Sequence, residues 1–351
     1  MQTVKDGESE EMTFSVVDLL PDEVFCLILS WVPKESVAPT SRTSRRWYSC
    51  SPSHLRNKFS IRWACSSFAS LQWACLQQGY YWDLWTCQQA AANGCVEALR
   101  WARCHGCAWN EWICQAAARN GHLEVLKWAY YNGCPWDAWT CASAAEGGHL
   151  DVLKWARANG CPWDGNTCIC AAENGHVEVL AWATNNGCPS DEDVVYLAAK
   201  NGHLGVLKSV NQASLLGNSD ICAAAASNGH LEVLKFAIEN GCLWGLETCL
   251  MAAANGHLEV LQWARETGCP WDEETCARAA RNGHLGVLQW ARENGCPWNE
   301  ETCACAARNG HLEVLKWVRE HGCPWDSRVG KWAAEKGHSE VLKWARENGC
   351  P

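Results

Sequence analysis

The sequence has no apolar run long enough to span a membrane, and its first residues lack the apolar core of a secretory signal. Both absences argue against a membrane partner and against secretion. They also place the 25 cysteines in a reducing compartment, where disulfides rarely persist. We therefore expect a cytoplasmic or nuclear protein.

Concentrated positive charge is missing as well. The formal net charge is −10 at pH 7, and no basic cluster stands out in any stretch of the chain. Proteins that bind nucleic acid usually carry a basic patch that contacts the phosphates. The charge pattern therefore argues against a nucleic-acid partner.

Recognisable catalytic motifs are absent too. The chain has no glycine-rich phosphate loop, no Ser/His/Asp arrangement and no paired-carboxylate motif. We expect a protein without catalytic activity of its own, without a cofactor and without a metal site.

What the sequence does contain is a repeat of 27 residues. Cys269–Gly295 reads CPWDEETCARAARNGHLGVLQWARENG, and Cys296–Gly322 reads CPWNEETCACAARNGHLEVLKWVREHG. Tiling this frame backwards from Gly349 gives ten units over residues 80–349. Self-similarity at a fixed period of this size indicates a repeat array, in which stacked neighbours bury a shared core.

Each unit predicts two short helices joined by a tight turn. An Asp or Asn caps the first helix, small residues form its core face, Asn-Gly ends it, and larger apolar residues form the face of the second helix. In the unit that begins at Cys269 these positions are Asp272 (cap), Cys276, Ala279 and Ala280 (first helix), Asn282 and Gly283 (turn), and Leu285, Val287, Leu288 and Ala291 (second helix).

The run Ala-Ala-x-x-Gly-His at Ala279–His284, followed by Leu-x-Val-Leu and Asn-Gly, resembles the ankyrin repeat. The resemblance implies an all-α solenoid of about ten helical hairpins that binds a target protein. The unit is about six residues shorter than the usual ankyrin repeat. We therefore expect the β-hairpin finger between repeats to be reduced to the Cys-Pro-Trp-Asp turn. The Thr-Pro-Leu-His signature is replaced by Glu-Thr-Cys-Ala.

Residues 14–50 follow a different pattern, with a predicted helix that begins at Leu20-Pro21-Asp22-Glu23 and ends at Pro33. A second predicted helix runs into Arg45-Arg46-Trp47. This pattern resembles an F-box, a helical module that docks a Skp-family adaptor and through it a cullin ubiquitin ligase. The adaptor-binding residues that the resemblance implies are Leu20, Pro21, Val24, Ile28, Leu29 and Val32.

Two functions stay open at this point. In the first, the chain is the substrate-recruiting subunit of a Skp/cullin/F-box ubiquitin ligase, and the repeats bind a target protein of unknown identity. In the second, it is a repeat scaffold with no role in ubiquitin transfer, and the N-terminal helices only cap the open end of the array.

The predicted domain organisation has four parts. Residues 1–13 are an acidic, disordered N-terminus; 14–50 form the F-box-like domain; 51–79 form a degenerate repeat; and 80–351 form the ankyrin-like array. Within the array, residues 188–241 depart most from the consensus.

Cysteine and histidine recur at fixed positions of the unit. One cysteine follows the closing glycine, a second lies in the first helix, and a histidine follows the inter-helix glycine. We expect the cysteines to pack as small hydrophobic residues and the histidines to tie the turn between the two helices by hydrogen bonds. A metal ladder is disfavoured, because neighbouring units lie about 10 Å apart and zinc needs its ligands about 2 Å away.

Tryptophan is unusually frequent, with 24 residues. Most occupy two repeat positions, in the turn and in the second helix, where we expect them to pack between repeats. Trp85, Trp112 and Trp139 are different, because later units place Glu247 and Glu274 in the same position. Local packing is one reading of these three. The other is a partner-binding patch, which fits a target with a hydrophobic and a basic segment.

Overall fold

The structure, a computed structural model, describes residues 84–104, 106–190, 193–210 and 215–351. The predicted N-terminal parts, residues 1–13, 14–50 and 51–79, lie outside these ranges. Within them the chain forms twenty α-helices and no strand. The residues divide into two compact units, one that ends at Trp136 and one from Asp137 to Pro351, and each is described by itself.

The helices come in pairs, one pair to each repeat. The first unit contains α6 (Leu84–Ala92), α7 (Val96–Cys104), α8 (Glu111–Arg119) and α9 (Leu123–Tyr131). The second unit contains α10 (Ala138–Glu146), α11 (Leu150–Ala158), α12 (Gly165–Glu173), α13 (Val177–Asn185), α14 (Asp193–Lys200), α15 (Leu204–Ser209), α16 (Ser219–Ser227), α17 (Leu231–Glu239), α18 (Leu246–Ala254), α19 (Leu258–Glu266), α20 (Glu273–Arg281), α21 (Leu285–Glu293), α22 (Glu300–Arg308), α23 (Leu312–Glu320), α24 (Arg328–Glu335) and α25 (Ser339–Glu347).

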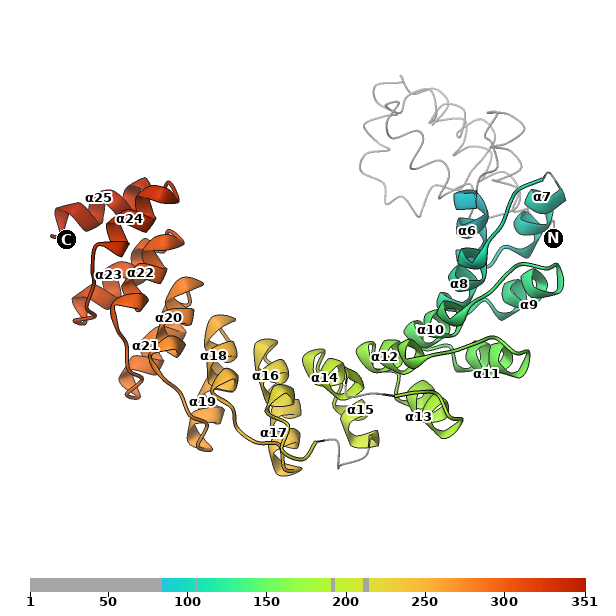
Figure 1. Cartoon of the computed structure of the whole chain (residues 1–351), viewed down its shortest axis with the longest axis horizontal. Helices are drawn as coiled ribbons and strands as arrows, with labels where there is room; N and C mark the ends of the chain where they lie inside the picture. Colours follow the sequence, from blue (N-terminus) through green and yellow to red (C-terminus); the bar gives the residue numbers. More distant parts are fainter. Residues whose placement is uncertain (1–83, 105, 191–192, 211–214) are drawn as a thin grey trace, which may run out of the picture. The chain divides into compact units, whose positions relative to one another are not determined.

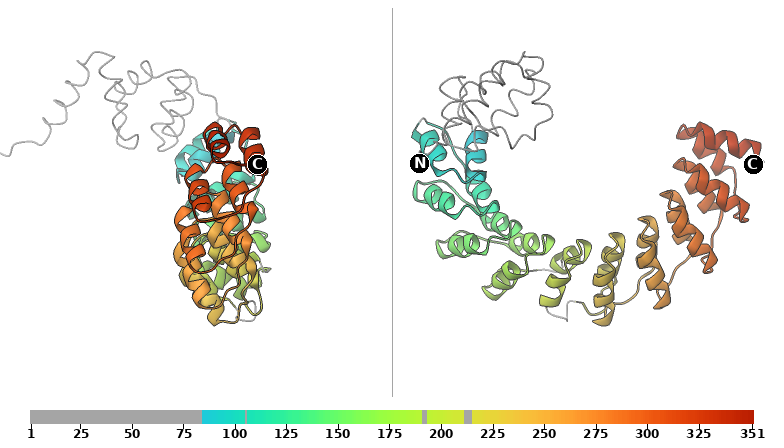
Figure 2. Two further views of the ribbon diagram at one scale, coloured as in Figure 1. Left: turned by 90° about the vertical axis from the view of Figure 1, so that its left-hand side faces the viewer. Right: turned by 180° about the vertical axis from the view of Figure 1, so that it is seen from behind.

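The second unit is a stack of these hairpins. Its even-numbered first helices form one row, and its odd-numbered second helices form another row beside it (Figures 1 and 2). Each first helix packs against the first helix of the next repeat, as α20 does against α22. This arrangement confirms the predicted all-α array of helical hairpins. In the described residues no helix combines the length and the apolar character that a membrane crossing requires.

The sequence signals for helix ends are confirmed in the structure. The predicted cap residues Asn110, Asp164, Asn218, Asp272 and Asn299 each accept a hydrogen bond from the backbone N–H two residues later, at 2.9–3.2 Å. The core face of the first helix is fully buried, as Cys276, Ala279 and Ala280 are in α20. Small residues there allow the close approach of neighbouring first helices.

The repeated histidines link neighbouring repeats. In each case Nε2 lies 2.8–3.1 Å from a backbone carbonyl 30 residues earlier, at the end of the preceding repeat's first helix. The residues are His122, His176, His203, His257, His284, His311 and His338. The histidines therefore hold an inter-helix turn by hydrogen bonds, as expected. The turn that each imidazole bonds to belongs to the preceding repeat.

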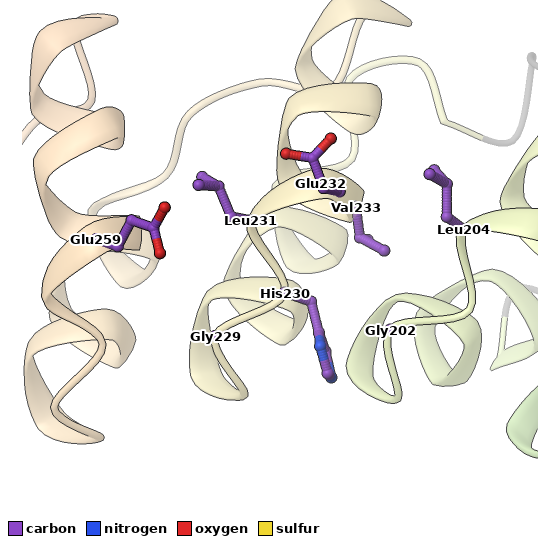
Figure 3. Close-up of a pocket in the computed structure, with 8 residues that line it drawn as sticks. All are labelled: Gly202, Leu204, Gly229, His230, Leu231, Glu232, Val233 and Glu259. Atoms are coloured by element: carbon purple, nitrogen blue, oxygen red, sulfur yellow. The ribbon is translucent and has the colours of Figure 1, made fainter.

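Each of these rings also lies against the inter-helix glycine of the preceding repeat. Figure 3 shows His230 directed toward the turn of Gly202, where an added Cβ would come within 2.6 Å of the ring. Gly202 has a φ of +81°, a region that other residues rarely adopt. Burial lowers the pKa of His230, which favours the neutral ring. The glycine therefore serves two purposes, a left-handed turn and a seat for the next histidine.

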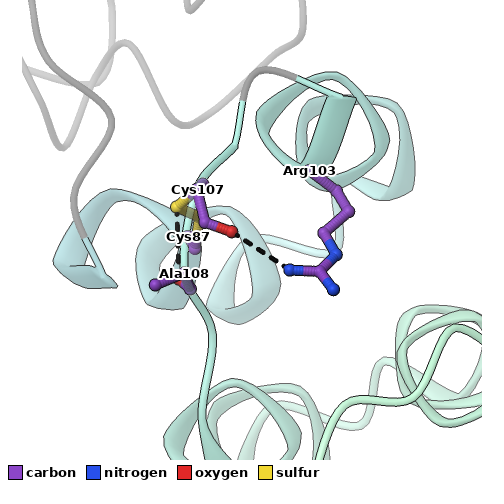
Figure 4. Close-up of a disulfide and its surroundings, with 4 residues drawn as sticks. All are labelled: Cys87, Arg103, Cys107 and Ala108. Atoms are coloured by element: carbon purple, nitrogen blue, oxygen red, sulfur yellow. Dashed lines mark hydrogen bonds between the residues drawn. A yellow bond between two sulfur atoms is a disulfide. The ribbon is translucent and has the colours of Figure 1, made fainter.

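The two cysteine positions also meet. The thiols of Cys249 and Cys269 share a hydrogen bond, which lowers the pKa of Cys269 and raises that of Cys249. The closing cysteine reaches back to the preceding repeat as well, since Cys296 Sγ donates to Asp272 O at 3.4 Å. Most cysteines thus pack as buried thiols, as predicted. The pair Cys87 and Cys107 is an exception, because a disulfide joins them (Figure 4).

The irregular stretch, residues 188–241, differs mainly in the helices of its first repeat. There α14 has eight residues and α15 has six, while most helices have nine. Helix α15 ends at Ser209, where Val210 turns to an extended conformation. Leu215 occupies the closing-cysteine position and is fully buried.

The contact between a histidine ring and the inter-helix glycine of the preceding repeat can be tested with a matched pair of glycines. Gly256 and Gly268 both have positive φ, but an added Cβ at Gly256 meets the His284 ring at 2.8 Å, whereas at Gly268 it meets nothing within 4 Å. Gly268→Ala should lower the free energy of unfolding by about 1 kcal/mol, from backbone strain alone. Gly256→Ala should lower it by about 2–4 kcal/mol, because overpacking adds to that strain.

Urea unfolding of both variants measures the difference. Adding His284→Ala to Gly256→Ala should recover part of the loss, because the ring that clashes is gone. Equal losses in the two glycine variants would show that the ring does not constrain this turn.

Candidate partner-binding surface

The three tryptophans singled out in the sequence are all solvent-exposed. Trp85 on α6 is 42% exposed and Trp112 on α8 is 51% exposed, and these two helices pack together in the first unit. Trp139 on α10, in the second unit, is 51% exposed. The structure places Trp85 and Trp112 on neighbouring helices. The role of all three in binding stays a prediction.

Local helix stability gives no reason for an indole at this position. The position lies in the first turn of the helix, where acidic residues interact favourably with the helix dipole. Later repeats follow that rule with Glu247 and Glu274. The backbone N–H of Trp112 donates to Asn110 Oδ1 at 3.2 Å, a bond that any side chain at this position would permit. The exposed indole is therefore available for a partner.

A hollow of about 510 Å³ adjoins Trp139 on the first-helix row of the second unit. Its lining comes from α10, α12 and the turns that follow α12 and α14: Trp139, Glu146, Asn166, Ile169, Cys170, Glu173, Asn174 and Asn201. The sequence analysis did not find this hollow. Asn174 and Asn201 belong to the Asn-Gly turn that most repeats share, so nothing in the sequence set them apart.

Carboxylates occupy the tryptophan position further along the row, and some of them have cationic partners. Glu274 pairs with Arg278 at 2.8 Å, and Glu301 pairs with Arg328. Asp220 and Glu247 form no ion pair among the described residues. The acidic character expected from the sequence is therefore partly neutralised in α20 and α22.

The consensus tryptophans make one contact within their own repeat that the sequence analysis did not predict. In each of these repeats the turn tryptophan packs against the second-helix tryptophan of the same repeat, with ring centroids 5.6–6.0 Å apart. The pairs are Trp109–Trp128, Trp163–Trp182, Trp244–Trp263, Trp271–Trp290, Trp298–Trp317 and Trp325–Trp344. Both rings of each pair belong to one repeat, so this contact adds to the expected packing between repeats.

An arginine near the end of the second helix makes the contact between repeats, with the turn tryptophan of the next repeat. Arg292 lies over the Trp298 ring at 4.2 Å, and its guanidinium donates to Cys296 O at 3.3 Å. The same arrangement recurs for Arg103 (Figure 4), Arg157, Arg265 and Arg319. Sequence reasoning missed these arginines. The available signal was an arginine that repeatedly precedes the turn tryptophan by six residues.

In the described part of the chain no three His, Cys, Asp or Glu side chains gather in a way that could hold a metal ion. The histidine series instead bonds to backbone carbonyls, one ring to each repeat.

Comparison with known families gives two matches. Residues 17–62 match a family model described as F-box-like, and residues 87–130 and 221–269 match one described as ankyrin repeats in many copies. No curated protein matches the chain. The six predicted adaptor-binding residues, Leu20, Pro21, Val24, Ile28, Leu29 and Val32, fall in the F-box-like match and lie outside the residues that the structure describes.

The arginine contact predicts a loss of stability on truncation. Arg292→Ala removes a cation–π contact and a hydrogen bond, so we expect the free energy of unfolding to fall by about 1 kcal/mol. Arg100→Ala is the control, because Arg100 is an exposed arginine on a second helix, α7. Urea unfolding of both variants decides the matter, and similar losses would contradict the role given to Arg292.

The exposed tryptophans predict the opposite behaviour. Trp112→Ala should change the free energy of unfolding by less than about 0.5 kcal/mol, because the indole is half exposed. Trp128→Ala should cost about 3 kcal/mol, because its ring packs against Trp109. Thermal unfolding monitored by circular dichroism tests both. A large loss for Trp112→Ala would assign that ring to local packing.

Proposed function

We propose that this ankyrin repeat protein, with its N-terminal F-box-like domain, recruits a target to a Skp/cullin/F-box ubiquitin ligase. The family matches support a protein-interaction scaffold. The single observation that carries the finer proposal is the order of the two modules, an F-box-like segment directly ahead of a repeat array. Such an order joins an adaptor-docking end to a target-binding end in one chain.

The proposed mechanism is proximity. The F-box-like residues, with Leu20 and Ile28 at the centre of the apolar set, dock the Skp-family adaptor and through it the cullin. The repeats hold the target, which raises its effective concentration near the ubiquitin-carrying enzyme. In this proposal the chain itself contributes no catalytic group. Ubiquitin is transferred to the target by the ubiquitin-carrying enzyme, in the cytoplasm or the nucleus.

The exposed tryptophans support the target-binding part of this proposal. Trp85 and Trp112 present indoles from two packed helices, and Trp139 presents a third in the second unit. Tryptophan is enriched among residues that dominate binding energy, because one ring removes a large apolar area from water with little loss of conformational freedom. We therefore propose these three residues as anchors for the target.

A scaffold without ubiquitin transfer is the second candidate. Pro39 interrupts the second predicted helix of the F-box-like segment, and Thr40 and Thr43 replace the apolar residues that the family prefers there. In this reading the N-terminal helices cap the array, and the repeats bind their target for another purpose.

Co-purification of the full chain with a Skp-family adaptor separates the two candidates. The parent should retain the adaptor, and the double variant Leu20→Asp with Ile28→Asp should lose it, because charges replace the apolar contact. Trp112→Ala is the matched control and should retain it, since the change lies in the repeats. Failure of the parent to retain adaptor, with native circular dichroism for all three proteins, would leave the cap reading.

A further inference from the structure

We propose that the hollow beside Trp139 binds an arginine side chain of the target protein. The proposal rests on the scaffold function, and it adds a chemical class for one contact. The hollow lies wholly within the second unit, on the exposed row of first helices. It combines an exposed aromatic ring with a lining rich in hydrogen-bond acceptors.

Each asparagine of the lining uses one of its two amide N–H donors within the protein. Asn174 Nδ2 donates to Cys170 O at 2.9 Å, and Asn201 Nδ2 donates to Glu173 O at 3.2 Å. Asn166 Nδ2 donates to Asp164 Oδ2 at 3.1 Å, a residue outside the hollow. Each amide therefore keeps its carbonyl oxygen, an acceptor with two lone pairs, and one N–H for a ligand.

Carboxylates add negative charge to these oxygens. Glu146 and Glu173 both line the hollow, and Glu173 is exposed and forms no ion pair among the described residues. None of the eight lining residues is basic. Lys200 precedes Asn201 in the chain but does not line the hollow. A ligand with many donors and a positive charge therefore fits, whereas an anion would meet the repulsion of two carboxylates.

The aromatic side selects arginine among the cations. Trp139 is 51% exposed, and Ile169 extends the apolar wall beside it. A guanidinium is planar, carries five N–H donors and is weakly hydrated, so it stacks on an indole while its edge donates to oxygens. A lysine ammonium is compact and more strongly hydrated, and it lacks the flat face. The geometry thus favours arginine over lysine.

The combination occurs at one repeat of the second unit. The next repeats place Asn166, Asp193 and Asp220 at the tryptophan position, so the acceptor-rich surface continues there without an indole. Trp139 therefore adds the flat aromatic surface on which a planar cation can stack, and the acidic surface alone does not provide it.

The test uses the full chain labelled with 5-fluorotryptophan and followed by fluorine NMR. The resonance of Trp139 is assigned as the signal missing from Trp139→Phe, and that of Trp112 in the same way. The probe is Nα-acetyl-arginine methylamide, with the citrulline analogue as an uncharged match in shape and the lysine analogue as a second cation. A single side chain should bind in the millimolar range.

We expect the arginine probe to shift Trp139 along a saturable curve and to leave Trp112 in place. Citrulline and lysine analogues should bind about tenfold more weakly. Glu173→Gln should weaken the arginine titration about fivefold, because the carboxylate of an exposed ion pair is lost. Glu178→Gln, on an exposed face of α13 away from the hollow, is the control and should change nothing.

Equal shifts from arginine and citrulline, equal shifts at Trp112, or an unchanged titration in Glu173→Gln would overturn the proposal. A lysine analogue that binds as well as arginine would also overturn it, in favour of a general cation site. These outcomes are independent of adaptor co-purification. A chain that binds adaptor but not arginine keeps the scaffold function and loses only this contact.

Discussion

The contact between neighbouring repeats is the constraint on which the rest of the structure depends. A single pair of short helices cannot bury its apolar face, so each repeat is stable only through its neighbours. The His284 ring against Gly256, with its bond to Ala254 O, fixes the distance between two repeats. Arg292 over Trp298 and the cysteine at the turn hold the opposite edge.

These contacts divide the residues of a repeat into two groups. The positions that contact a neighbour carry the same residue in most repeats, because each one is matched to a partner in the next repeat. The positions that face solvent on the first helix are free to differ, as Trp139, Asn166 and Glu247 do at one position. Substitutions at these solvent-facing positions can therefore change which target is bound without any change in the packing between repeats.

The period of the sequence was enough to predict the helices, their caps and their buried faces, because those depend on residues within one unit. It did not reveal which neighbour a recurring residue contacts. His284 bonds to the preceding repeat and Trp298 pairs within its own repeat, yet both recur with the same spacing. The hollow beside Trp139 was missed for a related reason. It joins residues of three repeats, such as Ile169 and Asn201, that are ordinary in each repeat taken alone.

The link between a histidine and the preceding glycine has a direction, and this bears on how such a chain can change during evolution. Within the second unit, a repeat such as the one from Cys269 to Gly295 contacts the next repeat's histidine through its glycine, and the preceding repeat's glycine through its own histidine. Duplication or loss of a whole 27-residue segment preserves all of these links, while an insertion of another length inside the segment breaks two of them. The array can therefore lengthen or shorten by whole repeats. Proteins that descend from one ancestor can then differ in the number of repeats, and so in the length of the array, while each repeat still fits its neighbours.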